Sequence, residues 1–166
     1  MNKFEKVSLK EFKNHFINNP YWTHDEIEEA YKSIKLPCRS TNGSAGYDFY
    51  TPVNIVLNPG ESIIVPTGIR CFLDEDKVLQ IYPRSGLGFK FHMGLANTVG
   101  IIDSDYVNSD NEGHIMIKVV NNGSKELIVE QDKAFAQGII TQYFTVENDG
   151  ETEKQVRNGG FGSTNV

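Results

Sequence analysis

The sequence contains few cysteines and no long apolar run. Only two cysteines, Cys38 and Cys71, occur among its 166 residues. Their spacing matches no metal-ligand motif, and two thiols cannot build the disulfide framework of a small secreted domain. No segment has the roughly 18 consecutive apolar residues of a membrane span, and no apolar leader is evident. These absences predict a cytoplasmic protein with reduced thiols, whose single core is stabilised by packing alone.

Positive charge is also scarce. The chain has 16 Lys and Arg residues against 22 Asp and Glu residues, which gives a formal net charge of −6. A broad nucleic-acid or membrane surface requires an excess of cations, so we expect neither kind of partner. A local cationic pocket for a small polyanion is compatible with this balance.

The sequence pattern divides the chain into three parts. Residues 1–36 are predicted to be a helical extension, because capping boxes at Ser8 and Thr23 precede apolar residues at helical spacing. Residues 37–146 are predicted to be a β domain. The polar, glycine-rich residues 147–166 are predicted to be a mobile C-terminal arm outside the core.

Short β-rich segments separated by turn residues fill the middle part. Their spacing predicts an all-β fold, either a sandwich or a barrel. The expected strands are Asn54–Leu57, Ser62–Val65, Ile69–Leu73, Val78–Tyr82, His114–Val120, Leu127–Val129 and Ile139–Phe144.

The stretch from Asn97 to Tyr106 carries the strongest chemical signal. A β-branched run broken by Gly100 predicts two short strands with a tight bend, whose backbone groups and Asn97 amide suit the edge of a flat heterocycle. Tyr106 offers a ring for stacking, and Asp103 is placed to act as a base. Asp105 competes for that role, because carboxylates two residues apart on an extended chain share a face. A surface hairpin with an acidic tip fits these residues equally well.

Two further segments suggest phosphate binding. In Pro83–Gly88, glycines, one hydroxyl and Arg84 follow a strand directly, which suits an anion; a strand-ending turn with a solvated arginine is the alternative. In the tail, Phe161 could stack on a base while Arg157 holds terminal phosphates, so that the arm orders over a ligand. A plain disordered terminus is the alternative for the tail.

Two isolated polar residues lie beside small or apolar ones. Asp48 ends the segment Ala45-Gly-Tyr-Asp, and Gln137 ends Ala134-Phe-Ala-Gln. Each is compatible with a buried structural hydrogen bond as well as with a role in a site.

Taken in order, these five segments resemble the motifs of the trimeric dUTP diphosphatase (dUTPase) family, in its bacterial and phage type. The resemblance covers roughly residues 36–166. It implies a jelly-roll-like β barrel, a homotrimer with shared active sites, and hydrolysis of dUTP to dUMP and pyrophosphate, which keeps uracil out of DNA and supplies dUMP. It also implies Mg²⁺ as cofactor, held through substrate phosphates and waters and not directly by side chains.

The resemblance also assigns roles to single residues. Asp103 would be the general base, and Tyr106 would lie against the deoxyribose. The uracil would be bound by Asn97 and by the backbone of Gly100, Ile101 and Ile102. The phosphates would be held by Arg84, Ser85, Gly86 and Gln137, with Asp48 supporting the phosphate and metal region. The arm residues closing over the nucleotide would be Arg157, Phe161, Gly162 and Ser163.

Two departures from the family pattern leave other functions open. Six residues, Val107–Glu112, are inserted after the Asp-Tyr motif, and the last motif lacks one residue after Arg157. With the helical extension, the insertion motivates a dUTP-responsive regulatory protein with a protein partner as an alternative. A related dCTP deaminase is disfavoured, because Lys118 stands about where that enzyme has a glutamate.

Overall fold

The structure is a computed structural model that describes residues 1–17 and 21–154. Its largest sheet has four antiparallel strands, in the order β2 (Tyr47–Tyr50), β11 (Ala134–Gln142), β6 (Lys77–Pro83) and β8 (Gly100–Ile102). A second sheet has the order β4 (Ser62–Pro66), β9 (Met116–Asn121) and β7 (Met93–Leu95). Two antiparallel pairs complete the fold: β3 (Ile55–Leu57) with β10 (Leu127–Val129), and β1 (Lys3–Lys6) with β5 (Ile69–Phe72).

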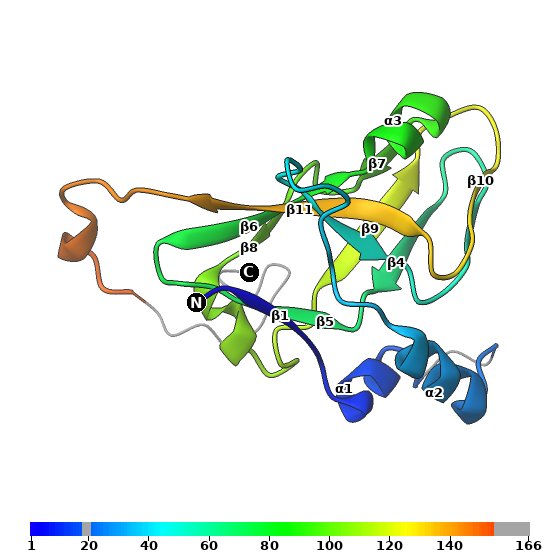
Figure 1. Ribbon diagram of the computed structural model, residues 1–166, viewed down its shortest axis with the longest axis horizontal. Coiled ribbons are helices and arrows are strands. Elements are labelled where there is room, and N and C mark those ends of the chain that lie inside the picture. The colour runs from blue at the N-terminus through cyan, green and yellow to red at the C-terminus, as the bar shows by residue number, and fades with distance from the viewer. Residues whose placement is uncertain (18–20, 155–166) are drawn as a thin grey trace.

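Several strands alternate between core and surface with the period of two that a half-buried sheet requires. In β9, Ile117 and Val119 are buried while Lys118 between them is exposed. The long strands β11 and β6 pair with each other near the middle of the molecule, and β4 pairs with β9 in the second sheet (Figure 1). Phe49, Leu79 and Phe135 are fully buried in the resulting core. The predicted all-β class is therefore confirmed.

The N-terminal part differs from the prediction at its first residues. Lys3–Lys6, expected within a helical extension, form strand β1 along β5. Tertiary contacts explain the difference: Arg70 Nη2 is 2.8 Å from Glu5 Oε2, and Lys3 Nζ lies 4.6 Å from the centre of the Phe72 ring. Pairing with β5 thus outweighs the local propensity of these four residues.

The two expected helices form, and they pack into the same hydrophobic cluster as the sheets. They are α1 (Leu9–Asn14) and α2 (His24–Ser33), which lie side by side at one end of the molecule (Figure 1). The buried side chains they and their flanks contribute are Val7, Phe12, Phe16, Ile27, Ala30 and Ile34. Contact is close at Gly68, where an added Cβ would lie 2.3 Å from the Cδ1 atom of Ile34. The extension is thus packed as part of the core.

Several other elements were not expected from the sequence. No such element was predicted for strands β2 and β7, the helix α3 (Ser85–Phe91) or the 3₁₀ helices η1 (Ser104–Asn108) and η2 (Asp149–Glu151). Strand β11 begins at Ala134 and ends at Gln142, earlier than the predicted Ile139–Phe144. Beyond β11 the described chain leads away from the body, with Phe144 and Val146 exposed (Figure 1). Within the described ranges, no helix is long and apolar enough to cross a membrane.

Candidate active site

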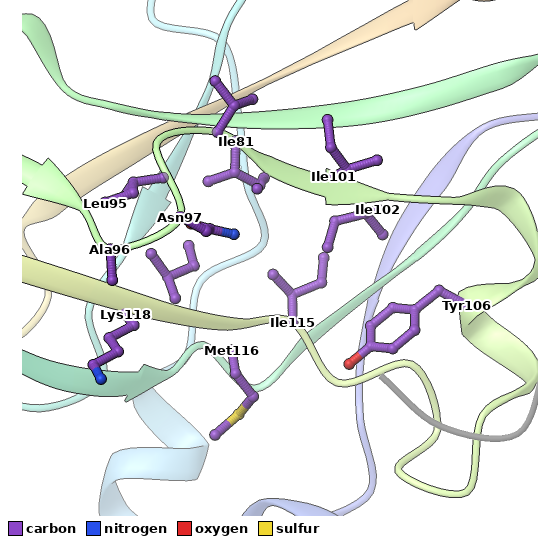
Figure 2. Close-up of a pocket in the computed structure, with 13 residues that line it drawn as sticks. Ile81, Leu95, Ala96, Asn97, Ile101, Ile102, Tyr106, Ile115, Met116 and Lys118 are labelled. Atoms are coloured by element: carbon purple, nitrogen blue, oxygen red, sulfur yellow. The ribbon is translucent and has the colours of Figure 1, made fainter. Parts of the chain in front are cut away.

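A cavity of about 420 Å³ lies between β8 and the chain entering β9 (Figure 2). Its size is in the range of small-molecule sites. Five residues expected to contact the pyrimidine or sugar line it: Asn97, Gly100, Ile101, Ile102 and Tyr106. The remaining lining residues are Ile81, Leu95, Ala96, Val99, Ile115, Met116, Ile117 and Lys118. The cavity is mostly apolar, so Asn97 supplies one of its few polar side chains.

A strained turn between β7 and β8 presents Asn97 to this cavity. Thr98 donates its backbone N–H to Leu95 O at 3.0 Å, and Val99 donates to Asn97 O at 2.7 Å. Thr98 has a φ of 67°, which is unusual for a β-branched residue. The expected bend at Gly100 is therefore wrong in position, because the chain turns over Asn97–Val99. Figure 2 shows the Asn97 amide directed into the cavity.

Gly100 does not form the predicted bend, since it begins β8. It pairs with Ile81 of β6, and a Cβ at Gly100 would lie 3.1 Å from the Cβ of Ile81. The missing side chain allows β8 to lie close against β6 at the wall of the cavity.

Tyr106 is fixed at the end of the cavity opposite Ala96 (Figure 2). Its side chain lies in η1 and is buried. The phenol donates to His114 O at 2.9 Å and accepts a hydrogen bond from Asn111 Nδ2 at 2.9 Å. Two partners from the segment that follows η1 therefore hold the hydroxyl, so that the ring forms a rigid wall.

Asp103 follows the lining residue Ile102 and is the N-cap residue of η1. Its side chain is half-buried, whereas that of Asp105 is exposed. The premise that these carboxylates share one face of an extended chain is wrong, because η1 begins at Ser104 and the chain turns there. Asp103 is thus the carboxylate at the boundary between cavity wall and helix.

Three of the phosphate-motif residues converge at a different place. Strand β11 sets Gln137 opposite Asp48 of β2 and opposite Tyr82 of β6. Arg84 Nε lies 3.1 Å from Asp48 Oδ1, and Gln137 Nε2 donates to Pro83 O at 3.2 Å. Asp48 is mostly buried while Arg84 remains 45% exposed. The arginine is therefore oriented by a carboxylate and still reaches solvent.

The segment expected to be a phosphate-binding turn is the helix α3. Ser85 and Gly86 form its first turn, in which backbone N–H groups have no acceptor within the helix. The helix ends at His92, which has a φ of 53°. A second cavity of about 410 Å³ is lined by Pro83, Arg84, Ser85, Gly88, Phe89 and His92. This cavity shares no lining residue with the one at Asn97 and Tyr106.

Predicted residues therefore form two clusters. One lines the first cavity, and in the other Asp48 and Gln137 contact Arg84 and Pro83, which line the second cavity. Arg157, Phe161, Gly162 and Ser163 lie outside the described residues. The sequence analysis missed two contributors: Lys118, which lines the first cavity, and Cys38, whose backbone carbonyl accepts a hydrogen bond from Asp48 N at 2.8 Å. The alternation of β9 gives a signal for Lys118, but no local pattern predicts the bridge at Cys38.

No group of three His, Cys, Asp or Glu side chains that could hold a metal ion occurs in the part of the chain that the structure describes. Mg²⁺ needs no such cage, since it usually keeps several waters and binds one or two carboxylates together with substrate phosphates. Asp48 beside Arg84 offers a carboxylate of this kind. Asp48 and Arg84 thus fit a metal that arrives with a polyphosphate.

A cavity of small-molecule size beside a carboxylate, with a separate Arg–Asp–Gln cluster, is compatible with a β protein that binds a small anionic ligand. Comparisons with known proteins identify its family. The dUTPase family model matches residues 32–165. A deoxyuridine 5'-triphosphate nucleotidohydrolase of Lactococcus lactis subsp. lactis (strain IL1403) is 38% identical over 142 residues, covering 84% of this chain and 95% of that protein. The chain therefore belongs to the dUTPase family.

Solved structures have the same fold. The dUTPase from Streptococcus mutans superposes with a TM-score of 0.65 at 27% identity, over 87% of this chain and 98% of that one. The Staphylococcus bacteriophage 80alpha dUTPase with dUPNHPP has a TM-score of 0.65 at 20% identity, over 100% and 99% of the two chains, which shows the fold alone. It is described among phage dUTPases that control transfer of virulence genes by a proto-oncogenic G protein-like mechanism. The expected dUTPase-type β fold is thus confirmed.

Proposed function

We propose that this protein hydrolyses dUTP to dUMP and pyrophosphate. One observation carries the proposal: in a chain of the dUTPase family, Asn97 and Tyr106 line one cavity of about 420 Å³ whose wall leads directly into Asp103. The Asn97 amide and the backbone of β8 would bind the edge of uracil. Tyr106 would lie against the deoxyribose and leave no room for a 2′-hydroxyl.

The chemical step requires a water aimed at the α-phosphorus and a base that takes its proton. Asp103 would be that base, a role generally worth about 10²- to 10⁴-fold in rate. Arg84, held by Asp48, would bind phosphate oxygens together with Ser85, Gly86 and Gln137. Fixed positive charge at these oxygens stabilises the negative charge that shifts to the leaving pyrophosphate.

A homotrimer with shared active sites would bring the two clusters together. The two cavities of one chain share no lining residue, so the phosphates of a nucleotide at Asn97 would reach the Arg84 cluster of a neighbouring copy. Arg157, Phe161, Gly162 and Ser163 of an arm would then close over the nucleotide. Mg²⁺ would be held mainly by the triphosphate and waters near Asp48, and would supply neutralising charge.

The alternative functions have less support. Lys118, and not a glutamate, lines the cavity on β9, which argues against pyrimidine deamination. A regulatory protein partner stays a prediction, and it is compatible with retained hydrolysis.

Pyrophosphate release from dUTP, UTP, dTTP and dCTP at equal concentration tests the proposal. We expect dUTP to have by far the highest kcat/KM, because uracil bound along β8 would leave no room for a 5-methyl group and Tyr106 would leave none for a 2′-hydroxyl. Comparable kcat/KM for dTTP or UTP would refute the cavity assignment. Release of ammonia from dCTP would instead favour a deaminase.

A further inference from the structure

The insertion Val107–Glu112 is bound to the N-terminal segment, far from it in sequence. Ser8 donates its backbone N–H to Glu112 Oε2 at 2.8 Å and its hydroxyl to Glu112 Oε1 at 2.6 Å. These hydrogen bonds hold the pKa of the Glu112 carboxyl below its usual value, with Arg70 adding to the effect. The same Ser8 hydroxyl accepts the Glu11 N–H at 3.1 Å and so caps α1. One serine thus joins the start of a helix to the insertion.

A second contact joins α1 to His114, two residues after the insertion. Gly68 donates its N–H to Nε2 of the buried His114 at 2.9 Å. This nitrogen therefore carries no proton, and in the neutral ring the proton is on Nδ1, which lies 3.4 Å from Glu11 Oε1. The capping box expected at Ser8 is only half formed, because the Glu11 carboxylate faces His114. Ser8 and Glu11 therefore contact Glu112 and His114, the two residues on either side of Gly113.

The insertion in turn holds Tyr106. Asn111 Nδ2 donates to the phenol oxygen at 2.9 Å, and His114 donates its backbone N–H to Asn111 O at 2.9 Å. Glu112 and Gly113 have φ values of 57° and 71°, which reverse the chain in a tight loop. A Cβ at Gly113 would lie 2.6 Å from the Cα of Val107, so the two ends of the loop are closely packed. Displacing Glu112 would therefore displace Asn111 and the carbonyl of His114, two hydrogen-bond partners of the phenol.

We propose that the N-terminal segment, residues 3–14, is a positioning element for Tyr106 and thereby sets the discrimination between deoxyribose and ribose. Ser8, Glu112 and Asn111 act through the tyrosine and do not touch substrate. The segment lies before residue 32, where the match to the family model begins, so it adds a support that the matched region does not contain. The inference rests on the proposed function, because Tyr106 must contact a sugar for its position to matter.

The test compares kcat/KM for dUTP with kcat/KM for UTP, both from pyrophosphate release. Three variants cut the network at different points: Ser8→Ala, Glu112→Ala and Asn111→Ala. Each is expected to lower the dUTP-to-UTP ratio by about tenfold, mainly through KM for dUTP, since a displacement of about 1 Å can cost up to 10²-fold. Ser8→Thr, which keeps the hydroxyl, should preserve the wild-type ratio. Glu126→Ala, at an exposed glutamate outside the network, should also preserve it.

A merely structural role would give a different result. If the melting temperature falls in Ser8→Ala and Asn111→Ala while the ratio is unchanged, the positioning role is refuted. If Glu112→Ala does not fold, the other two variants decide by the same criterion. A wild-type protein that does not hydrolyse dUTP would overturn the proposed function and this inference together, whereas active wild type with unchanged ratios overturns only the inference.

Discussion

Asp103 is the residue on which the proposed chemistry depends most. We expect Asp103→Asn to lower kcat for dUTP by at least about 10²-fold, because the amide keeps the shape but cannot take a proton. The Kd for dUTP should stay within about tenfold of wild type, as measured by calorimetry. Turnover at the wild-type rate would transfer the role of base to Asp105.

The buried imidazole of His114 makes stability depend on pH. Burial lowers its pKa to about 4, an effect that His15 strengthens and Glu112 opposes. The unfolded chain takes up a proton near the ordinary value of about 6.5, so stability is complete above that pH and falls between 6.5 and 4. From this pKa difference the loss approaches about 3 kcal/mol.

The pH effect can be measured by thermal unfolding from pH 7 to pH 4.5. His114→Gln should lose less stability than wild type over this interval, because its amide does not titrate. His24→Gln, at an exposed histidine, should follow the wild-type curve. Equal slopes for wild type and His114→Gln would contradict the assignment of the effect to His114.

At the scale of elements, the N-terminal helices are expected to stabilise the whole domain. Phe12 of α1 is fully buried, with ring-centre distances of 5.2 Å to Phe16 and 5.7 Å to Tyr31. Phe12→Ala should lower the free energy of unfolding by about 3–5 kcal/mol in urea titrations. Phe89→Ala, at a ring that is 88% exposed, serves as the control and should change it little. A loss below about 1 kcal/mol for Phe12→Ala would mean that the helices dock loosely.

Local signals predicted some elements and not others. The complete capping box at Thr23 forms as expected, because it depends only on residues three apart. Strand β1 could not be predicted, because Lys3–Lys6 is extended only through its pairing with β5, about 65 residues away in the chain. Helix α3 was missed because Gly86 and Gly88 are weak helix formers, and position next to β6 outweighs their propensity.

The candidate site likewise contains some residues that the local sequence predicts and others that only the fold brings together. The cavity residues from Asn97 to Tyr106 were predictable because they are close together in sequence and carry unusual chemistry. The ion pair of Arg84 with Asp48 depends on the strand order β2-β11-β6, which no local pattern specifies. The hydrogen bond between Ser8 and Glu112 could not be predicted from the sequence either, since 104 residues separate them.

In the whole molecule, each proposed active site would contain residues from more than one chain. The cavity with Asp103 at its wall and the cavity at Arg84 have no lining residue in common within a chain. In a symmetric trimer the same pair of surfaces meets at every interface, so each site would combine Asp103 of one copy with Arg84 of the next.

Complementation between two inactive variants tests this requirement most directly. Asp103→Asn lacks the base and Arg84→Ala lacks the phosphate cation, so each protein alone should release little pyrophosphate from dUTP. After co-refolding in equal amounts with random assembly, roughly a quarter of the sites should contain both intact residues, and activity should return to about that fraction of wild type. A mixture as inactive as its parents, with mixed trimers verified by native mass spectrometry, would contradict the shared site.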